Sequence, residues 1–188
     1  MPESQVKGLI FQGARRWMLR RYGEAGLESF IAKLPEPDRT LWTSDIILPM
    51  SWLPASAYTS MYEAQESLWG TGDGQLFQEA AAAVAFDDLS SVMKLFMKLG
   101  SPSFIAKRFP TVWDRYFSGG RYRLITLGSN ELVAEVEDAR AYGEAGCHGT
   151  MGWTRQALTY SGAKALRIEH TECVFAGAAR CVFRCAWQ

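Results

Sequence analysis

The chain has 188 residues, with 20 basic and 20 acidic side chains, so its formal net charge at pH 7 is zero. A chain without net charge creates no overall field that attracts nucleic acid or an anionic membrane, and we expect neither as a direct partner. Hydrophobic residues make up 48% and aromatic residues 13% of the sequence. This composition supports one domain, either with a large aromatic core or with a pocket for an apolar or aromatic ligand.

Neither secretion nor a membrane span is indicated by the sequence. Residues 1–10 lack the basic and long apolar regions of a signal peptide. The longest apolar run, from Ala80 to Phe86, is far too short to cross a bilayer. We therefore expect a cytoplasmic protein, in which reduced cysteines favour metal binding over disulfide bonds.

The part of the chain before Gly119-Gly120 has mostly helical periodicity. One helix should end at Pro35 and Pro37, since proline does not continue a helix. A basic cluster of four arginines falls on the outer side of the first helix, and we interpret it as a solvated face, with an interaction patch as the alternative. These arginines are Arg15, Arg16, Arg20 and Arg21. The predicted helices cover 13–22, 24–34, 38–43, 54–69 and 75–86, then one capped by Ser90 or Ser91 and stopped at Gly100, one from Pro102 capped by Ser101, and a turn around 112–117.

The second part of the chain predicts two hairpins separated by a helix. The strands are 121–127 with 131–137 and 166–175 with 180–187, and the helix is 141–160. We therefore predict an α+β fold, in which N-terminal helices pack with a C-terminal four-stranded antiparallel sheet in the order strand-strand-helix-strand-strand. The chain should form a single domain over 1–188, with a mostly helical part (1–118) and a metal-bearing part (119–188).

The cysteines and one histidine are grouped in the second part of the chain. Cys147 stands alone, whereas Cys173 and Cys181 lie close to His170 in sequence. Thiolate and imidazole groups are the ligands that tetrahedral zinc prefers, so these four residues form a predicted zinc site. The alternative is that the cysteines are small buried hydrophobic residues. Cys185 shares strand parity with Cys181, and we expect it in the core because a closed structural site has only four positions.

The spacing of His170 and Cys173 makes a specific demand on the backbone. Strict strand alternation places the two side chains on opposite faces of the sheet. Both can reach one metal ion only if the strand contains a bulge or if Cys173 already lies inside the turn.

Several short motifs in a fixed order carry a family resemblance. The segment Ile168 to Cys173, followed by Gly177, Cys181, Phe183 and Trp187, resembles the end of the 4-vinyl reductase-type domain. The whole chain is similar to a myxobacterial family within the superfamily that joins this domain to haem-NO-binding-like domains. The other matching stretches are Gly8-Leu9-Ile10-Phe11, Arg21-Tyr22-Gly23 to Leu34-Pro35, Pro49-x-Ser51-Trp52-Leu53-Pro54, Leu99-Gly100-Ser101-Pro102 and Trp113-x-x-Tyr116-Phe117-x-x-Gly120.

The resemblance implies a fold related to nitric-oxide-sensing haem domains and to vesicle-tethering subunits, often present as a homodimer. It also implies relatives on bacterial transcription activators that bind small aromatic effectors. Some of these carry zinc on one Cys, one Glu and two Cys. In this sequence His170 stands where the acidic ligand would be.

We predict a non-catalytic sensor or small-molecule-binding module with structural zinc, and an apolar or aromatic ligand between the helices and the sheet. The predicted wall residues are Tyr122, Leu124, Trp153 and Ile168. The alternative is a protein-protein interaction module, for tethering or dimerisation, without a small ligand. An enzyme is disfavoured because the chain has no Gly-x-Gly-x-x-Gly fingerprint and no P-loop.

We also predict that haem is absent. His148 follows Cys147 on the predicted helix and therefore points about 100° away from it. The sequence contains no Tyr-x-Ser-x-Arg anchor for haem propionates. Trp153 lies about 120° around the helix from Cys147, so one side of the helix can serve the metal while another meets the core.

Overall fold

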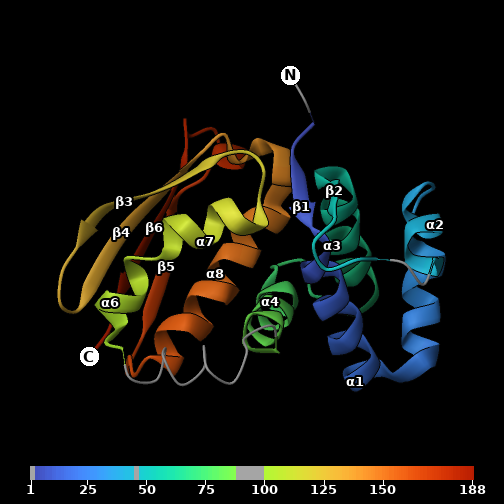
Figure 1. Cartoon of the computed structure of the whole chain (residues 1–188), viewed down its shortest axis with the longest axis horizontal. Coiled ribbons are helices and arrows are strands. Elements are labelled where there is room, and N and C mark those ends of the chain that lie inside the picture. The colour runs from blue at the N-terminus through green and yellow to red at the C-terminus, as the bar shows by residue number, and fades with distance from the viewer. Residues whose placement is uncertain (1–2, 45–46, 88–99) are drawn as a thin grey trace.

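The computed structural model describes residues 3–44, 47–87 and 100–188 (Figure 1). The first part contains β1 (Gln5–Lys7), α1 (Gly8–Lys33), α2 (Asp38–Thr43), β2 (Trp52–Pro54), α3 (Ala55–Trp69) and α4 (Gln75–Asp87). The second part contains α6 (Pro102–Ala106), α7 (Phe109–Tyr116), β3 (Arg121–Leu127), β4 (Glu131–Glu137), the 3₁₀ turn η1 (Ala139–Tyr142), α8 (Gly143–Tyr160), β5 (Arg167–Glu172), the 3₁₀ turn η2 (Val174–Ala176) and β6 (Cys181–Ala186). The helix predicted between Ser90 or Ser91 and Gly100 lies outside the described residues.

The C-terminal strands form a four-stranded antiparallel sheet in the order β3-β4-β6-β5. Helices α6, α7 and α8 lie along the sheet, and the N-terminal helices stand beyond α8 (Figure 1). The predicted α+β class and the strand-strand-helix-strand-strand order are confirmed. The short β1–β2 ladder was not predicted, because three residues are too few to show an alternating pattern.

Helix α1 joins two of the predicted helices across a kink at Gly23. This residue has φ 68° and ψ −172°, a conformation that glycine adopts without the clash a Cβ atom would cause. The helix begins earlier than predicted, at Gly8, and ends at Lys33, with Leu34 as its C-cap before Pro35. Further along, the Ser101 hydroxyl accepts a hydrogen bond from the Phe104 N–H at 3.2 Å, as the predicted cap of α6 requires.

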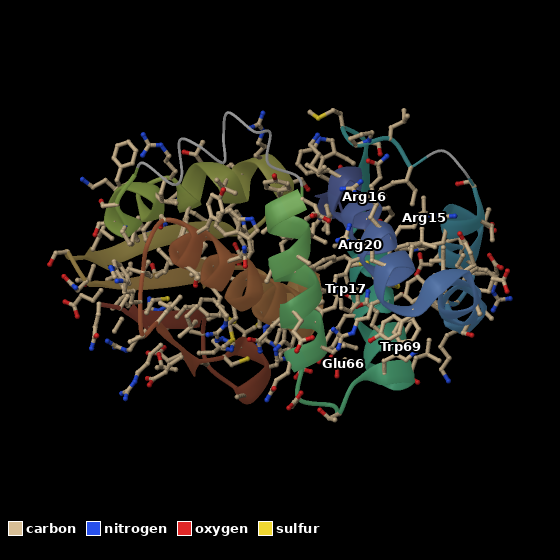
Figure 2. The ribbon with its side chains drawn as sticks, turned by 90° about the horizontal axis from the view of Figure 1, so that it is seen from below. Arg15, Arg16, Trp17, Arg20, Glu66 and Trp69 are labelled. Atoms are coloured by element: carbon tan, nitrogen blue, oxygen red, sulfur yellow. The ribbon has the colours of Figure 1, made fainter. Side chains whose placement is uncertain are left out.

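The basic cluster on α1 connects this helix to its neighbours (Figure 2). Arg15 donates a hydrogen bond at 2.9 Å to the carbonyl of Trp42, which belongs to α2. Arg20 forms an ion pair with Asp87 at the end of α4, and Arg21 pairs with another acidic side chain of the same helix. The interpretation as a solvated helix face is therefore incomplete, since these arginines make tertiary contacts.

Helix α8 approaches α4 closely at a glycine. A Cβ atom on Gly152 would stand 2.1 Å from the Gln78 carbonyl oxygen, which belongs to the α4 backbone. Backbone cannot move aside as the end of a flexible side chain can. The small residue at this position therefore sets the distance between the two helices.

We expect Gly152→Ala to lower the thermal midpoint by about 4–8 °C, because overpacking that costs about 3 kcal/mol outweighs the gain of about 1 kcal/mol in helix propensity. The exposed Thr159→Ala on the same helix is the matched control and should change the midpoint little. Thermal unfolding followed by circular dichroism measures both. An unchanged midpoint in Gly152→Ala would contradict the close helix contact.

Candidate metal centre and ligand cavity

Four side chains from three segments converge at one end of the sheet. Cys147 lies in the first turns of α8, His170 in β5, Cys173 just after β5, and Cys181 at the start of β6. One possible ligand atom from each of these residues lies within 4.8 Å of all the others. The structure therefore brings together the whole predicted ligand set, from positions up to 34 residues apart in sequence.

A bulge in β5 makes this convergence possible. His170 is paired with Phe183 in β6, whereas Glu172 is paired with Val182, so Thr171 is the extra residue on the bulged strand. Cys173 lies beyond the end of the strand, before η2. The bulge and the position of Cys173 beyond the strand were the two alternatives predicted from the sequence, and both are present. Together they bring His170 and Cys173 to the same side.

The sulfur atoms of Cys147 and Cys181 lie 3.6 Å apart. The hydrogen bond with Cys147 lowers the pKa of the Cys181 thiol to about 4, with help from His170 and the Val174 N–H. The same hydrogen bond, together with burial, raises the pKa of Cys147. The hydrogen bond therefore favours the thiolate, which is the form that binds metal, at Cys181 rather than at Cys147.

The surroundings of His170 suit it to bind a metal ion. Its ring stacks on Phe183, with centroids 4.5 Å apart and planes 10° from parallel, which fixes the ring orientation. Its Nε2 atom is buried and has no hydrogen-bond partner. A tetrahedral zinc ion with Zn–S bonds of about 2.3 Å has S–S edges of about 3.8 Å, close to the observed separation of Cys147 and Cys181. Three thiols and one imidazole therefore fit a closed zinc site in both chemistry and spacing.

Cys185 is not part of this group. It is buried in β6, where it is paired with Leu132 on one side and Ile168 on the other. Burial raises the pKa of its thiol to about 12, so it stays protonated. This placement agrees with the prediction that Cys185 belongs to the core, and it makes Cys185 a natural control for experiments on the cluster.

A second feature lies on another side of α8. A cavity of about 90 Å³ is lined by side chains from α1, α3, α4, α7, β3 and α8. Its wall is mainly aromatic and aliphatic, with Phe77 and Val84 from α4 and Phe109 and Trp113 from α7. The cavity thus sits among helices rather than directly between α8 and the sheet.

Two of the four predicted wall residues line this cavity and two do not. Tyr122 and Trp153 are in the wall, whereas Leu124 and Ile168 are not. The reason is the strand order, since β5 lies at the opposite edge of the sheet from β3 and carries Ile168 away from α7. Leu124 and Ile168 are half-buried and pack against the core instead.

Gln65 is the most unusual residue of the wall, and it was not predicted from the sequence as a wall residue. It lies on α3 at helical spacing from Tyr58 and Met61, which also line the cavity. Its side chain is fully buried. The signal in the sequence was a single amide within an apolar helix face, which is weak evidence without the tertiary structure.

No protein-family model matches the chain, and no curated protein matches it. Solved structures match over nearly its whole length. An Fe(II) unliganded H-NOX protein from K. algicida covers 97% of this chain and 96% of its own, with a TM-score of 0.73 and 11% identity. An H-NOX protein from S. oneidensis in the Fe(II)NO state covers 97% and 99%, with a TM-score of 0.74 and 12% identity. The fold is that of the H-NOX domains.

A third example, a mutant of the T. tengcongensis H-NOX, has a TM-score of 0.68 and 12% identity, with 97% of each chain covered. At such identities the likeness concerns the fold. The predicted relation to haem-NO-binding-like domains is confirmed at this level. The narrower resemblance to a myxobacterial family and to 4-vinyl reductase-type domains stays a prediction.

The comparison corrects our prediction about haem. The neighbouring structures include Fe(II) proteins in NO and CO ligation states, and one of them concerns haem redox potential. The prediction of no haem, which was drawn from the position of His148 and from the missing Tyr-x-Ser-x-Arg anchor, was therefore wrong, because the chain shares its fold with haem-binding domains.

The described side chains, as they are arranged here, do not form a haem site. His148 stacks on Tyr62 with centroids 5.6 Å apart, and its Nδ1 lies 3.3 Å from the Gln78 amide nitrogen. Burial lowers the pKa of this histidine. Among the described residues of the cavity wall there is no histidine, arginine or lysine.

Among the described residues, no helix combines the length and apolar character that a membrane span requires.

The geometry of the cluster predicts a specific disulfide bond in metal-free protein. Diamide takes two electrons and two protons from a pair of nearby thiols, and we expect the Cys147–Cys181 bond to form first because these sulfur atoms are only 3.6 Å apart. Peptide mapping without reduction, after removal of metal with a chelator, identifies the product. A crosslink that contains Cys185 would contradict the described arrangement.

Proposed function

We propose that the chain is a non-catalytic, small-molecule-binding sensor module with one structural zinc ion. The observation that carries the proposal is the double role of α8. This helix supplies Cys147 to the metal cluster and Gly149, Thr150, Trp153 and Thr154 to the wall of the cavity. The metal and the ligand would therefore both act on the position of one helix.

In this proposal Cys147, His170, Cys173 and Cys181 hold the zinc ion. Three thiolates, a neutral imidazole and Zn²⁺ give the site a charge of about −1. The ion would tie the β5–β6 hairpin to the start of α8, and its binding energy would contribute to folding. A closed set of four ligands leaves no open position for a substrate or an activated water, which supports a structural role rather than a catalytic one.

The cavity supports a small and mainly apolar ligand. Its volume of about 90 Å³ is below the 300–1,000 Å³ typical of sites for drug-sized molecules. H-NOX structures in NO and CO ligation states show that this fold accommodates small ligands in other proteins. The alternative of an interaction module without a ligand, and the predicted homodimer, stay predictions.

The first test concerns the metal. We expect wild-type protein purified without added metal to carry one zinc ion per chain, and Cys173→Ser to lose it because one of four ligands is gone. The matched control is Cys185→Ser, which removes a buried thiol outside the cluster and should keep the zinc. Native mass spectrometry reads the stoichiometry. Retention of zinc by Cys173→Ser with unchanged affinity would refute the ligand set.

Metal removal should also affect stability. A chelator is expected to lower the thermal midpoint of the wild type and of Cys185→Ser but not that of Cys173→Ser, since only the first two have metal to lose.

The second test concerns the cavity. Xenon under pressure should shift the amide signals of residues around the cavity in nuclear magnetic resonance spectra, because dry apolar cavities bind xenon. Ala81→Leu should weaken this response by filling space, since Ala81 lines the cavity. Ala82→Leu on the same helix is the control, because Ala82 is not among the lining residues. A wild type without any xenon response would leave the interaction module as the better explanation.

A further inference from the structure

Gln65 has an unsatisfied amide in an apolar wall. The residue is 0% exposed, it lines the cavity, and neither its Nε2 nor its Oε1 has a hydrogen-bond partner. Burying an amide without hydrogen-bond partners destabilises the folded state. A glutamine kept at such a cost needs a partner that the described residues do not provide.

Four other polar side chains around the cavity already form hydrogen bonds. Tyr58 donates to the Ala145 carbonyl at 3.3 Å, and Thr150 donates to the Gly146 carbonyl at 2.7 Å. Thr154 forms a side-chain hydrogen bond with Tyr122, whose hydroxyl is fully buried. Gln65 is thus the polar group of the described wall that remains open to a ligand.

The amide of Gln65 determines which chemical group of a ligand can pair with it. A glutamine side chain presents a donor and an acceptor side by side on one edge. A ligand satisfies both only if it offers an acceptor next to a donor, as a primary carboxamide or a protonated carboxylic acid does. A ketone has only the acceptor and leaves the Gln65 oxygen unpaired.

The absence of basic residues from the described wall and the volume of the cavity further restrict the possible ligands. A carboxylate would be buried without a cationic partner, because the described wall has no lysine, arginine or histidine. An engineered cavity of about 150 Å³ holds benzene, with six non-hydrogen atoms. On that scale the cavity of about 90 Å³ accommodates roughly four such atoms.

We propose that this cavity binds a compact, uncharged carboxamide-type molecule, with Gln65 as the residue that pairs with its amide edge. The inference rests on the proposed function, since it names the ligand class of the same cavity. It assigns to Gln65 the role of selecting ligands by hydrogen bonding, while the aromatic wall contributes apolar contact.

Acetamide and acetone provide a matched pair of probes, because they have the same shape and only acetamide has the donor. We expect wild-type protein to bind acetamide at least about tenfold more tightly than acetone, from two hydrogen bonds against one with an unpaired group. Acetate, which is charged, should not compete. Titration followed by amide chemical shifts measures all three.

Gln65→Met is the decisive variant, because methionine has a similar length without the amide. We expect its affinity for acetamide to fall about tenfold, while its affinity for acetone changes by less than about twofold. Gln156→Met is the control, a half-buried glutamine of α8 that does not line the cavity. A variant that loses both ligands equally would indicate a structural role for Gln65 and would overturn the proposal.

Stability gives a second readout that does not depend on a ligand. Without ligand, Gln65→Met should have a higher thermal midpoint than the wild type, because an unsatisfied buried amide is replaced by an apolar group. A lower midpoint would indicate that buried water already pairs with Gln65, and would also overturn the proposal.

The two proposals fail in different ways. Equal binding of acetamide and acetone by the wild type would overturn the role of Gln65 but leave the cavity as a ligand site. Absence of binding by either probe and by xenon would overturn both proposals. A Soret absorption band stoichiometric with chain would show haem in this space and would also overturn the carboxamide proposal.

Discussion

The close contact between α8 and α4 is the constraint on which the rest of the structure depends. At Gly152 the two helices approach so closely that the α4 backbone occupies the place of a Cβ atom. This contact fixes both the position and the rotation of α8. Because the angle between residues along a helix is set by its geometry, fixing one side directs Cys147 to the end of the sheet and Trp153 to the cavity.

The cluster and the cavity are therefore separate sites on one rigid element. A zinc ion held by the β5–β6 hairpin would secure the first turns of α8, where helix ends otherwise fray. The cavity lies further along the same helix, where packing against α3, α4 and α7 leaves space. A metal at the start of the helix would keep the wall in place while the ligand enters and leaves.

The likeness to H-NOX domains concerns the fold, and a fold alone does not decide the chemistry of a site. The chain superposes on these domains over 97% of its length with 10 to 14% identity. In the structure described here, His148 is directed at Tyr62 and Gln78, whereas an amide of α3 is the open polar group of the cavity. The layers of helices and sheet depend on apolar periodicity, whereas the chemistry of the cavity depends on the individual side chains that line it.

The sequence by itself determined the α+β class, both hairpins, and the grouping of Cys147, His170, Cys173 and Cys181, because periodicity, turn residues and ligand types are local signals. It also required a bulge or a turn near Cys173. Only the tertiary structure decided that both occur, that Gln65 faces a cavity, and that Ile168 does not. These outcomes depend on strand order and on the distance between helices, which are set by contacts between residues far apart in sequence.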